Sequence, residues 1–372
     1  MRKAMAALAA FGMLATGSLT ACTDDGGDSG GNDGGGNTTT TNGGPAKVGV
    51  IMPDRDTQRW GTDDPKFLKA AFDAAGVPVD IQNAEGSRER FVALAESMIS
   101  SGAKVLIIVA LDAVSGKAAL DRAKAAGVKT IDYDRLTLNG GAEYYVSFDN
   151  RQVGVLQGQG LVRCLTEKGY ENPVVAQLNG SPTDNNATEF KRGYDSVLQP
   201  KYDAAVYRKG PDQSVPDWKD SVGSTIFQQM LNQQPEIEGV LAANDGLGNA
   251  VINVLKKKKL NGKVPVTGQD ASVQGLQNIL AGDQCMTVYK AIKPEAEAAA
   301  KLAITLFKGQ TPDVKELDRQ KDVESGAYVP FVKLNPVAID KTNINLVIED
   351  GFVDRKAVCT PKFAQACEDA GL

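Results

Sequence analysis

The sequence predicts an α/β fold with two doubly wound lobes, in which helices cover both faces of a parallel sheet. Short apolar runs alternate with amphipathic helical stretches along most of the chain, which is typical of buried parallel strands. This alternation restarts at Pro173, so that two series follow each other. The chain has 372 residues, of which 42% are hydrophobic, and this is enough to fill two cores.

The first series starts at the apolar run Val48–Met52. Within it, Phe91, Leu94 and Met98 recur at helical spacing and define one face of a predicted helix. The segment Lys104–Ala110 is largely apolar and is predicted to be a buried strand. The strands predicted in this series are 48–52, 79–82, 104–110, 129–133 and 144–148, and the helices are 65–75, 88–101, 113–126 and 151–166.

The second series repeats the same order of strand and helix. Two such series within about 300 residues indicate two lobes rather than one very wide sheet. The strands predicted in this series are 173–178, 204–207, 239–243, 264–267 and 286–289, and the helices are 189–198, 219–232, 247–255 and 273–281.

The N-terminus has the features of an export signal. Arg2 and Lys3 precede an apolar stretch that is too short to span a bilayer comfortably. The stretch ends in LTAC at 19–22, which resembles a bacterial lipobox and implies cleavage before Cys22 and a diacylglycerol on its thiol. Ordinary cleavage near an A-x-A site is the alternative. We expect a lipoprotein signal peptide over 1–21.

A polar stretch follows this signal. Residues 23–45 consist of Gly, Asp, Asn, Ser and Thr, with no apolar residue before Pro45. Such a segment cannot bury enough surface to offset the entropy of ordering it. We expect residues 22–45 to be a disordered tether that holds the folded body at the outer face of the cell membrane, with the lipid as the only membrane contact.

Four further cysteines are compatible with disulfides at this extracytoplasmic location. Cys359 and Cys367 lie close together in a polar C-terminal tail, 353–372, and a local bridge is expected there. Cys164 and Cys285 either pair or stay as buried thiols. No CxxC motif occurs, so the usual spacing of redox and zinc sites is missing.

Composition excludes several classes of function. The chain has no histidine, which removes Ser-His-Asp and Cys-His catalysis and His-based zinc sites. Its formal net charge is −5, so no basic excess favours nucleic acid. No nucleotide-binding glycine loop is present. We expect no cofactor, no metal and no nucleic-acid partner.

Polar or charged residues follow nearly every predicted strand. In open α/β sheets, ligands bind outside the carboxyl ends of the strands, so these side chains are candidates for one shared site. For any single residue, capping of the next helix or an Asx turn is a sufficient explanation. The residues at these strand ends are Asp54, Asp112, Asp134, Arg135, Asp149, Asn150, Asp184, Asn185, Asn186, Asn244, Asp245, Gln269, Asp270 and Lys290.

The chemistry of these residues points to a neutral polyhydroxyl ligand. Trp60 and Trp218, the only tryptophans, both lie in polar, loop-like stretches. A tryptophan ring beside polar groups suits a sugar, whose C–H face stacks while its hydroxyls form hydrogen bonds. An anionic ligand would need mainly positive groups, whereas this set mixes Asp, Asn, Arg and Lys.

Several ordered stretches resemble bacterial periplasmic sugar-binding proteins of the ribose/galactose/xylose type, and most of all their D-xylose-binding members. The resemblance runs from about Lys47 to Phe352. The stretches that carry it are KVGVIMPDRDTQRW, IDYDR, YVSFDNRQVG, GSPTDNNA, AANDG, GKVPVTGQDA and MTVYK. The family implies a type I periplasmic binding protein fold with three crossings between lobes. The implied N-terminal lobe is 46–148 plus 288–327, and the C-terminal lobe is 149–287 plus 328–352.

The resemblance also implies the ligand-binding residues. The two tryptophans would pack against the sugar ring, and the other side chains would bind its hydroxyls. The implied site is Arg59, Trp60, Asp134, Arg135, Asp184, Asn186, Trp218, Asn244, Asp270 and Lys290.

The function implied is that of a substrate-binding subunit of an ABC importer, and not an enzyme. Such a protein, expected as a monomer, traps D-xylose by hinge closure and delivers it to the membrane permease. Glucose or another aldopyranose, and sugar sensing for a receptor, are the alternatives. A carbohydrate-active enzyme is a less favoured alternative. The carboxylate pair Asp63-Asp64 could suggest a glycosidase, but no activating context accompanies it in the sequence. A transcriptional regulator would need a helix-turn-helix where this chain has its signal.

Overall fold

The computed structural model describes residues 44–372. The predicted signal peptide, the lipidation site Cys22 and nearly all of the predicted tether lie outside the described residues. Within the described part, no helix has both the length and the apolar character needed to cross a membrane.

The first lobe is built on a seven-stranded sheet in the order β10-β11-β5-β4-β3-β1-β2. All neighbouring strands are parallel except the antiparallel pair β10–β11. The strands are β1 (Lys47–Met52), β2 (Val79–Asn83), β3 (Ala103–Ile108), β4 (Lys129–Tyr133), β5 (Tyr144–Phe148), β10 (Asp318–Lys321) and β11 (Tyr328–Leu334). The helices are α1 (Gln58–Gly61), α2 (Asp63–Ala74), α3 (Arg88–Ser100), α4 (Ala113–Ala125), α10 (Ile292–Phe307) and the 3₁₀ turn η2 (Val314–Glu316).

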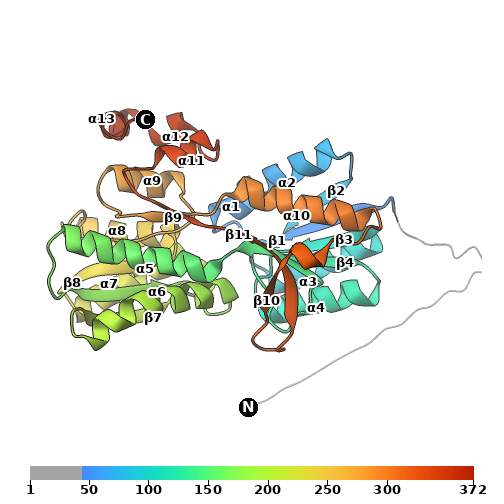
Figure 1. Ribbon diagram of the computed structural model, residues 1–372, viewed down its shortest axis with the longest axis horizontal. Helices are drawn as coiled ribbons and strands as arrows, with labels where there is room; N and C mark the ends of the chain where they lie inside the picture. Colours follow the sequence, from blue (N-terminus) through green and yellow to red (C-terminus); the bar gives the residue numbers. More distant parts are fainter. Residues whose placement is uncertain (1–43) are drawn as a thin grey trace, which may run out of the picture. The chain divides into compact units, whose positions relative to one another are not determined.

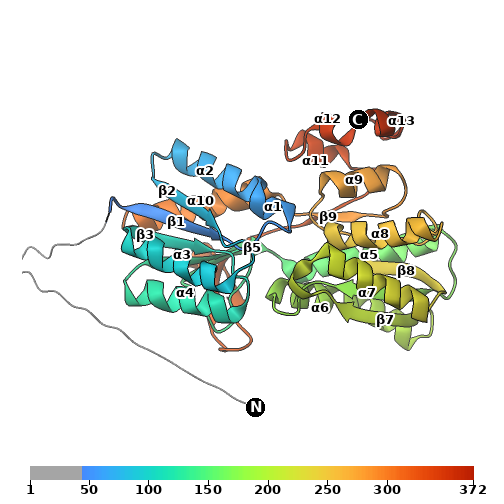
Figure 2. The same ribbon diagram turned by 180° about the vertical axis from the view of Figure 1, so that it is seen from behind.

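Both faces of this sheet are covered, as the sequence predicts for a doubly wound lobe. On β1, Val48 and Val50 pack with α2 and α10, while Ile51 packs with α3 and α4 on the opposite face. This alternation follows from the two-residue period of a strand. Figure 1 shows α2 and α10 on one side of the sheet, and Figure 2 shows α3 and α4 on the other.

The second lobe contains a parallel sheet in the order β7-β6-β8, and a short antiparallel pair, β9–β12. Helices α5 and α6 lie on one side of the parallel sheet, and α7 and α8 on the other (Figures 1 and 2). The strands are β6 (Val174–Asn179), β7 (Arg208–Ser214), β8 (Ile237–Ala242), β9 (Thr287–Tyr289) and β12 (Val337–Ile339). The helices are α5 (Asn150–Glu167), α6 (Asn185–Asp203), the 3₁₀ turn η1 (Pro216–Trp218), α7 (Asp220–Gln233), α8 (Asp245–Lys257) and α9 (Val273–Leu280).

Two predicted strands of the second lobe are wrong. The strand expected over 204–207 lies instead at Arg208–Ser214, because α6 continues through Pro200 to Asp203. The real strand, RKGPDQS, is polar and lies at the edge of its sheet, so it lacks the apolar run that marks a buried strand. The segment expected over 264–267 contributes only a single parallel bridge, from Val266 to Val240.

Three chain segments cross between the lobes. The first lies at Asp149, between β5 and α5, where the resemblance implies it. The second follows Tyr289, because β9 pairs with β12 in the second lobe, whereas α10 packs on α2 in the first. The third lies between Leu334 and Val337. Assignment of 328–352 to the second lobe is therefore wrong for 328–334, because β11 pairs with β5.

Residues 340–372, which we call the C-terminal segment, pack on α9. Val347, Val358 and Phe363 share one buried cluster with Leu276 and Ile279 of that helix. The predicted local disulfide between Cys359 and Cys367 is present, and a second disulfide joins Cys164 to Cys285. The helices of this segment are α11 (Asn345–Glu349), α12 (Arg355–Val358), the 3₁₀ turn η3 (Pro361–Phe363) and α13 (Ala364–Asp369).

Candidate functional site

The ten side chains implied by the resemblance line one cavity between the lobes, which we call the central cavity. Thr57, Phe190 and Gln269 complete its lining. Most of these residues follow the carboxyl end of a strand, which is where open α/β sheets bind ligands. The ten residues are Arg59, Trp60, Asp134, Arg135, Asp184, Asn186, Trp218, Asn244, Asp270 and Lys290.

Arg59, on the short helix α1, is held by three carboxylates. Its Nε and Nη2 atoms donate to Asp64 at 2.9 and 2.7 Å, Nη2 donates to Glu295 at 2.7 Å, and Nη1 donates to Asp134 at 2.8 Å. Burial alone would lower the pKa of Arg59, but the charges of these carboxylates raise it well above its ordinary value. The guanidinium also lies 4.1 Å from the Trp60 ring centre, so Arg59 fixes the position of that ring.

Asp134 is the centre of the charged network. Its Oδ2 accepts hydrogen bonds from Arg59 and, at 2.6 Å, from Lys290 Nζ, and its Oδ1 accepts one from Asn186 Nδ2 at 2.9 Å. Burial alone would raise the pKa of Asp134, but the positive charges of Lys290 and Arg59 hold it far below its ordinary value. Asp134 is therefore an ionised acceptor at neutral pH.

Direct contacts join the two lobes across the central cavity. Arg135 Nε of the first lobe lies 2.9 Å from Asp184 Oδ2 of the second, and Asn186 of α6 donates to Asp134 of the first lobe. Asp184 also accepts from Trp218 Nε1 at 3.0 Å and from the Asn186 backbone N–H at 2.9 Å. It both caps α6 and lines the cavity, so the capping role does not exclude the binding role.

Asp270 is the carboxyl of the cavity that makes no salt bridge within residues 44–372. It accepts a hydrogen bond from Gln269 Nε2. Burial raises its pKa to about 7, although Lys290 and Arg59 oppose this. Its backbone φ is 103°, in a region that side chains other than glycine rarely adopt. Asp270 is thus a strained group whose hydrogen-bonding capacity is only partly used.

Both tryptophans are buried at the cavity wall. Trp60 is 2% exposed and Trp218 is 8% exposed. The Trp218 ring meets Phe190 edge-on, at 6.4 Å between centres, and it packs so closely on Gly180 that a Cβ there would overlap it. Trp218 itself has φ of 58°. The contacts around the ring therefore hold the Trp218 backbone in a strained conformation.

Other residues from the predicted strand ends serve the fold. Asp112 and Asp149 cap α4 and α5 by accepting from backbone N–H groups at 2.8 and 3.0 Å. Asp245 is fully buried and accepts from Ser272 and Thr287, both at 2.8 Å. For Asp112 and Asp149, the capping role weighed from sequence is the one observed. Asp245 does not cap α8, whose N-cap is Asn244, but ties this helix to Ser272 and to β9.

The residues that support Arg59 were not recognised from sequence. Glu295 lies in KPEAEAAA, which is typical of a surface helix, yet its side chain is fully buried. Burial raises the pKa of Glu295 to about 8, against the effect of Arg59. Asp64 accepts from Tyr133 Oη at 2.6 Å as well as from Arg59. Phe190, which also lines the cavity, was a recognisable aromatic shortly after the TDNN motif.

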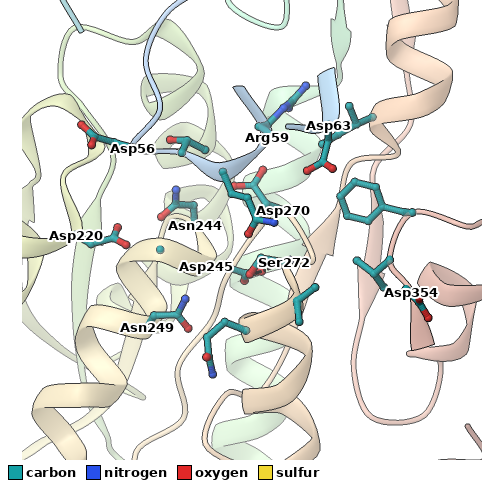
Figure 3. A pocket seen from close by; sticks show the side chains of 18 residues that line it. Asp56, Arg59, Asp63, Asp220, Asn244, Asp245, Asn249, Asp270, Ser272 and Asp354 are labelled. Atoms are coloured by element: carbon teal, nitrogen blue, oxygen red, sulfur yellow. Dashed lines mark hydrogen bonds between the residues drawn. The ribbon is translucent and has the colours of Figure 1, made fainter. Parts of the chain in front are cut away.

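A larger cavity adjoins the central one, and we call it the outer pocket (Figure 3). Its volume is ≈ 380 Å³, against ≈ 30 Å³ for the central cavity. The two share Thr57, Arg59, Asn244 and Asp270 as lining residues. The central cavity is small because the direct contacts between the lobes fill it, and it has room for no more than a few water molecules.

The described residues offer no metal site. Among 44–372, no three Cys, Asp or Glu side chains are arranged to hold a metal ion. The carboxylates of Asp134 and Asp184 in the central cavity face Arg59, Arg135 and Lys290 instead. This arrangement is suited to hydrogen bonding of a neutral polar ligand.

Comparisons with known proteins agree with this fold. The model of the periplasmic binding protein domain family matches residues 48–311. The chain is 35% identical to the D-xylose-binding periplasmic protein of Escherichia coli, over 82% of this chain and 90% of that protein. It is 33% identical to the multiple sugar-binding periplasmic receptor ChvE of Rhizobium radiobacter, over 82% and 89%.

Solved structures show the same architecture. A carbohydrate transporter solute-binding protein from Chloroflexus aurantiacus, in complex with D-glucose, has a TM-score of 0.76 and 28% identity, over 84% of this chain and 98% of that chain. These matches confirm the type I fold and the resemblance inferred from sequence. The chain therefore belongs to the periplasmic binding protein family, together with the sugar-binding proteins of ABC-type transport that it resembles.

Proposed function

We propose that this protein binds one monosaccharide, D-xylose or a closely related aldopyranose, in the central cavity and delivers it to an ABC permease. The observation that carries the proposal is the convergence of Asp134 and Arg135 from one lobe with Asp184, Asn244 and Asp270 from the other. Such a set offers both charged acceptors and charged donors to hydroxyl groups. Relatives named for D-xylose and for multiple sugars support this ligand class.

The two tryptophan rings would stack on the faces of the sugar ring. Trp60 and Trp218 come from different lobes and both line the cavity, so closure would bring them onto one ligand. Asp270 would accept a hydroxyl hydrogen bond, because its carboxyl has no cation partner in the described residues. Asp134, which Lys290 and Arg59 keep ionised, would likewise accept a hydrogen bond from a sugar hydroxyl.

Access of the sugar requires separation of the lobes. A cavity of ≈ 30 Å³ does not admit a monosaccharide, so the Arg135–Asp184 and Asn186–Asp134 contacts must open first. The three crossings provide the hinge for this motion. Hydroxyl groups of the bound sugar would then take over hydrogen bonds that these pairs make to each other.

Location and delivery belong to the same proposal. Lipidation of Cys22 and the tether 22–45 would hold the protein, as a monomer, at the outer face of the membrane beside the permease. Presentation of sugar to a sensory receptor would use the same closed form.

We propose binding without turnover of the sugar. Chemical characterisation of the sugar after incubation with the protein tests this, since any product would indicate an enzyme.

Calorimetry with a panel of pentoses and hexoses tests the proposed ligand. We expect D-xylose or another aldopyranose to bind with a Kd in the micromolar range or below, which corresponds to about −8 kcal/mol. A panel in which no monosaccharide gives heat or a shift in Tm would contradict the proposal.

A further inference from the structure

The outer pocket has the size and lining of a ligand site, although it shares with the proposed sugar site only Arg59, Asn244 and Asp270 of the ten residues named there. Its ≈ 380 Å³ falls within the range of roughly 300–1,000 Å³ that is usual for small-molecule sites. Asp56 and Asp63 of the first lobe and Asp220 and Asn249 of the second lobe line it (Figure 3). Phe352 of the C-terminal segment also lines it. A molecule in this pocket would therefore touch both lobes.

The C-terminal segment builds part of this pocket. Phe352, Val353 and Asp354 all line it, and they lie beyond the residues that the family model matches. The Phe352 ring is only half-buried and packs on Tyr289, at 5.3 Å between ring centres, just before the second crossing. The disulfide between Cys359 and Cys367 closes the segment that follows.

The lining has the same mixed chemistry as the central cavity. Phe352 and Val273, which are both only partly buried, provide apolar surface for the C–H face of a sugar ring. Asp63 and Asp220 make no salt bridge within the described residues, so their oxygens are available to hydroxyl hydrogens. Asn249 uses its Oδ1 to accept from Asn278 at 2.6 Å, which leaves its amide N–H groups available as donors.

The outer pocket adjoins the central cavity at the residues that would hold the sugar. Arg59, Asn244 and Asp270 line both cavities. A ring bound to Asn244 and Asp270 would have its nearest free space on the outer side of these residues, since the central cavity itself has almost none. A substituent on that side of the ring would extend into the outer pocket.

From these observations we infer that the outer pocket is a subsite for a second sugar ring, so that the protein accepts a disaccharide as well as a monosaccharide. This inference rests on the proposed function, because the first ring is the one held in the central cavity. The second ring lies between the α1–α2 region of the first lobe and the C-terminal segment, against Phe352. The C-terminal segment thereby sets the length of saccharide that the closed protein holds.

Calorimetry with paired ligands tests the inference. D-xylose and xylobiose, and D-glucose and cellobiose, are titrated into the wild-type protein and into three variants. Phe352→Ala removes the aromatic wall, and Asp220→Ala removes an exposed carboxylate of the pocket without disturbing any salt bridge within 44–372. Leu346→Ala is the matched control, because Leu346 is an exposed apolar residue of the same segment that does not line the pocket.

We expect a disaccharide to bind the wild type at least as tightly as its monosaccharide. Phe352→Ala should weaken disaccharide binding about tenfold and Asp220→Ala about threefold, with less than about twofold change for the monosaccharide. Leu346→Ala should change neither. Binding of a monosaccharide without either disaccharide, or an equal loss for both ligands in Phe352→Ala, would overturn the subsite alone. Absence of binding by every saccharide would overturn the proposed function with it.

Discussion

Replacement of Asp270 by asparagine should stabilise the sugar-free protein at alkaline pH while weakening sugar binding. Burial raises the pKa of Asp270 from 3.8 to about 7. Between pH 3.8 and about pH 7, Asp270 therefore keeps its proton in the folded state but has lost it in the unfolded state. Stability contributed by this group is complete below pH 3.8 and is lost as the pH rises through about 7. The amide of the Asp270→Asn variant does not titrate, so the variant escapes this loss.

The size of the effect follows from the shift. One pKa unit corresponds to about 1.36 kcal/mol, so a shift from 3.8 to about 7 amounts to about 4 kcal/mol once the group is fully ionised in both states. About 2–3 kcal/mol of this loss falls between pH 5 and pH 8. Glu295, whose pKa is about 8, titrates in the same range, but its contribution cancels when variant and wild type are compared at each pH.

Urea unfolding at pH 5 and pH 8 measures the effect. The stability advantage of Asp270→Asn over wild type should grow by about 2–3 kcal/mol from the lower to the higher pH. Asp134→Asn is the control variant, for which we expect a loss of stability instead of a gain. Its carboxylate is paired with Lys290 and Arg59, so its loss leaves buried positive charge and should destabilise the protein by about 3–5 kcal/mol at pH 8.

Sugar affinity completes this test. Asp270→Asn should bind the monosaccharide about 5- to 150-fold more weakly. The amide keeps only one of the two acceptor oxygens and replaces the other by an N–H donor, and an unmatched buried hydroxyl costs about 1–3 kcal/mol. If Asp270→Asn exceeds the wild type in stability by the same amount at pH 5 and pH 8, the claim that burial raises the pKa of Asp270 is refuted. Unchanged affinity would remove Asp270 from the site.

Three further predictions concern other parts of the protein. Trp218→Ala should reduce sugar affinity about tenfold and remove part of any ligand-linked change in fluorescence, and equal affinity would make this ring a bystander. Gly180→Ala should weaken binding while leaving far-UV circular dichroism unchanged, because its Cβ would displace the Trp218 ring, and wild-type affinity would show that the ring tolerates the shift. Cys22→Ser should release the protein from cell membranes into the soluble fraction, and persistent sedimentation with membranes would exclude a lipid anchor.

Hydrophobic periodicity was enough to predict the lobes and most of their strands, since buried parallel strands are continuous apolar runs. It failed at β7, whose polar residues 208–214 form a sheet edge. The third crossing was implied by the family resemblance and not by periodicity, and the structure places it later, between Leu334 and Val337. Nothing local in YVPFVKL distinguishes a strand that pairs with β5 from one that pairs with β9, because that choice depends on the rest of the sheet.

The candidate site was predictable to the extent that it lies at strand ends and in ordered motifs. Asp134, Asn244 and Asp270 all follow predicted strands, and the structure brings them to one cavity. Glu295 was not predictable, because a glutamate in a helical stretch is usually exposed and only the tertiary fold brings it to Arg59. The packing of the C-terminal segment on α9 likewise depends on contacts between residues far apart in the chain.

A crystal structure of the protein with its bound monosaccharide tests the central claim most directly. The account predicts one sugar ring in the central cavity, between Trp60 and Trp218, with hydroxyl groups bonded both to Asp134 of the first lobe and to Asp270 of the second. A sugar held by side chains of a single lobe, or found only outside the central cavity, would contradict it.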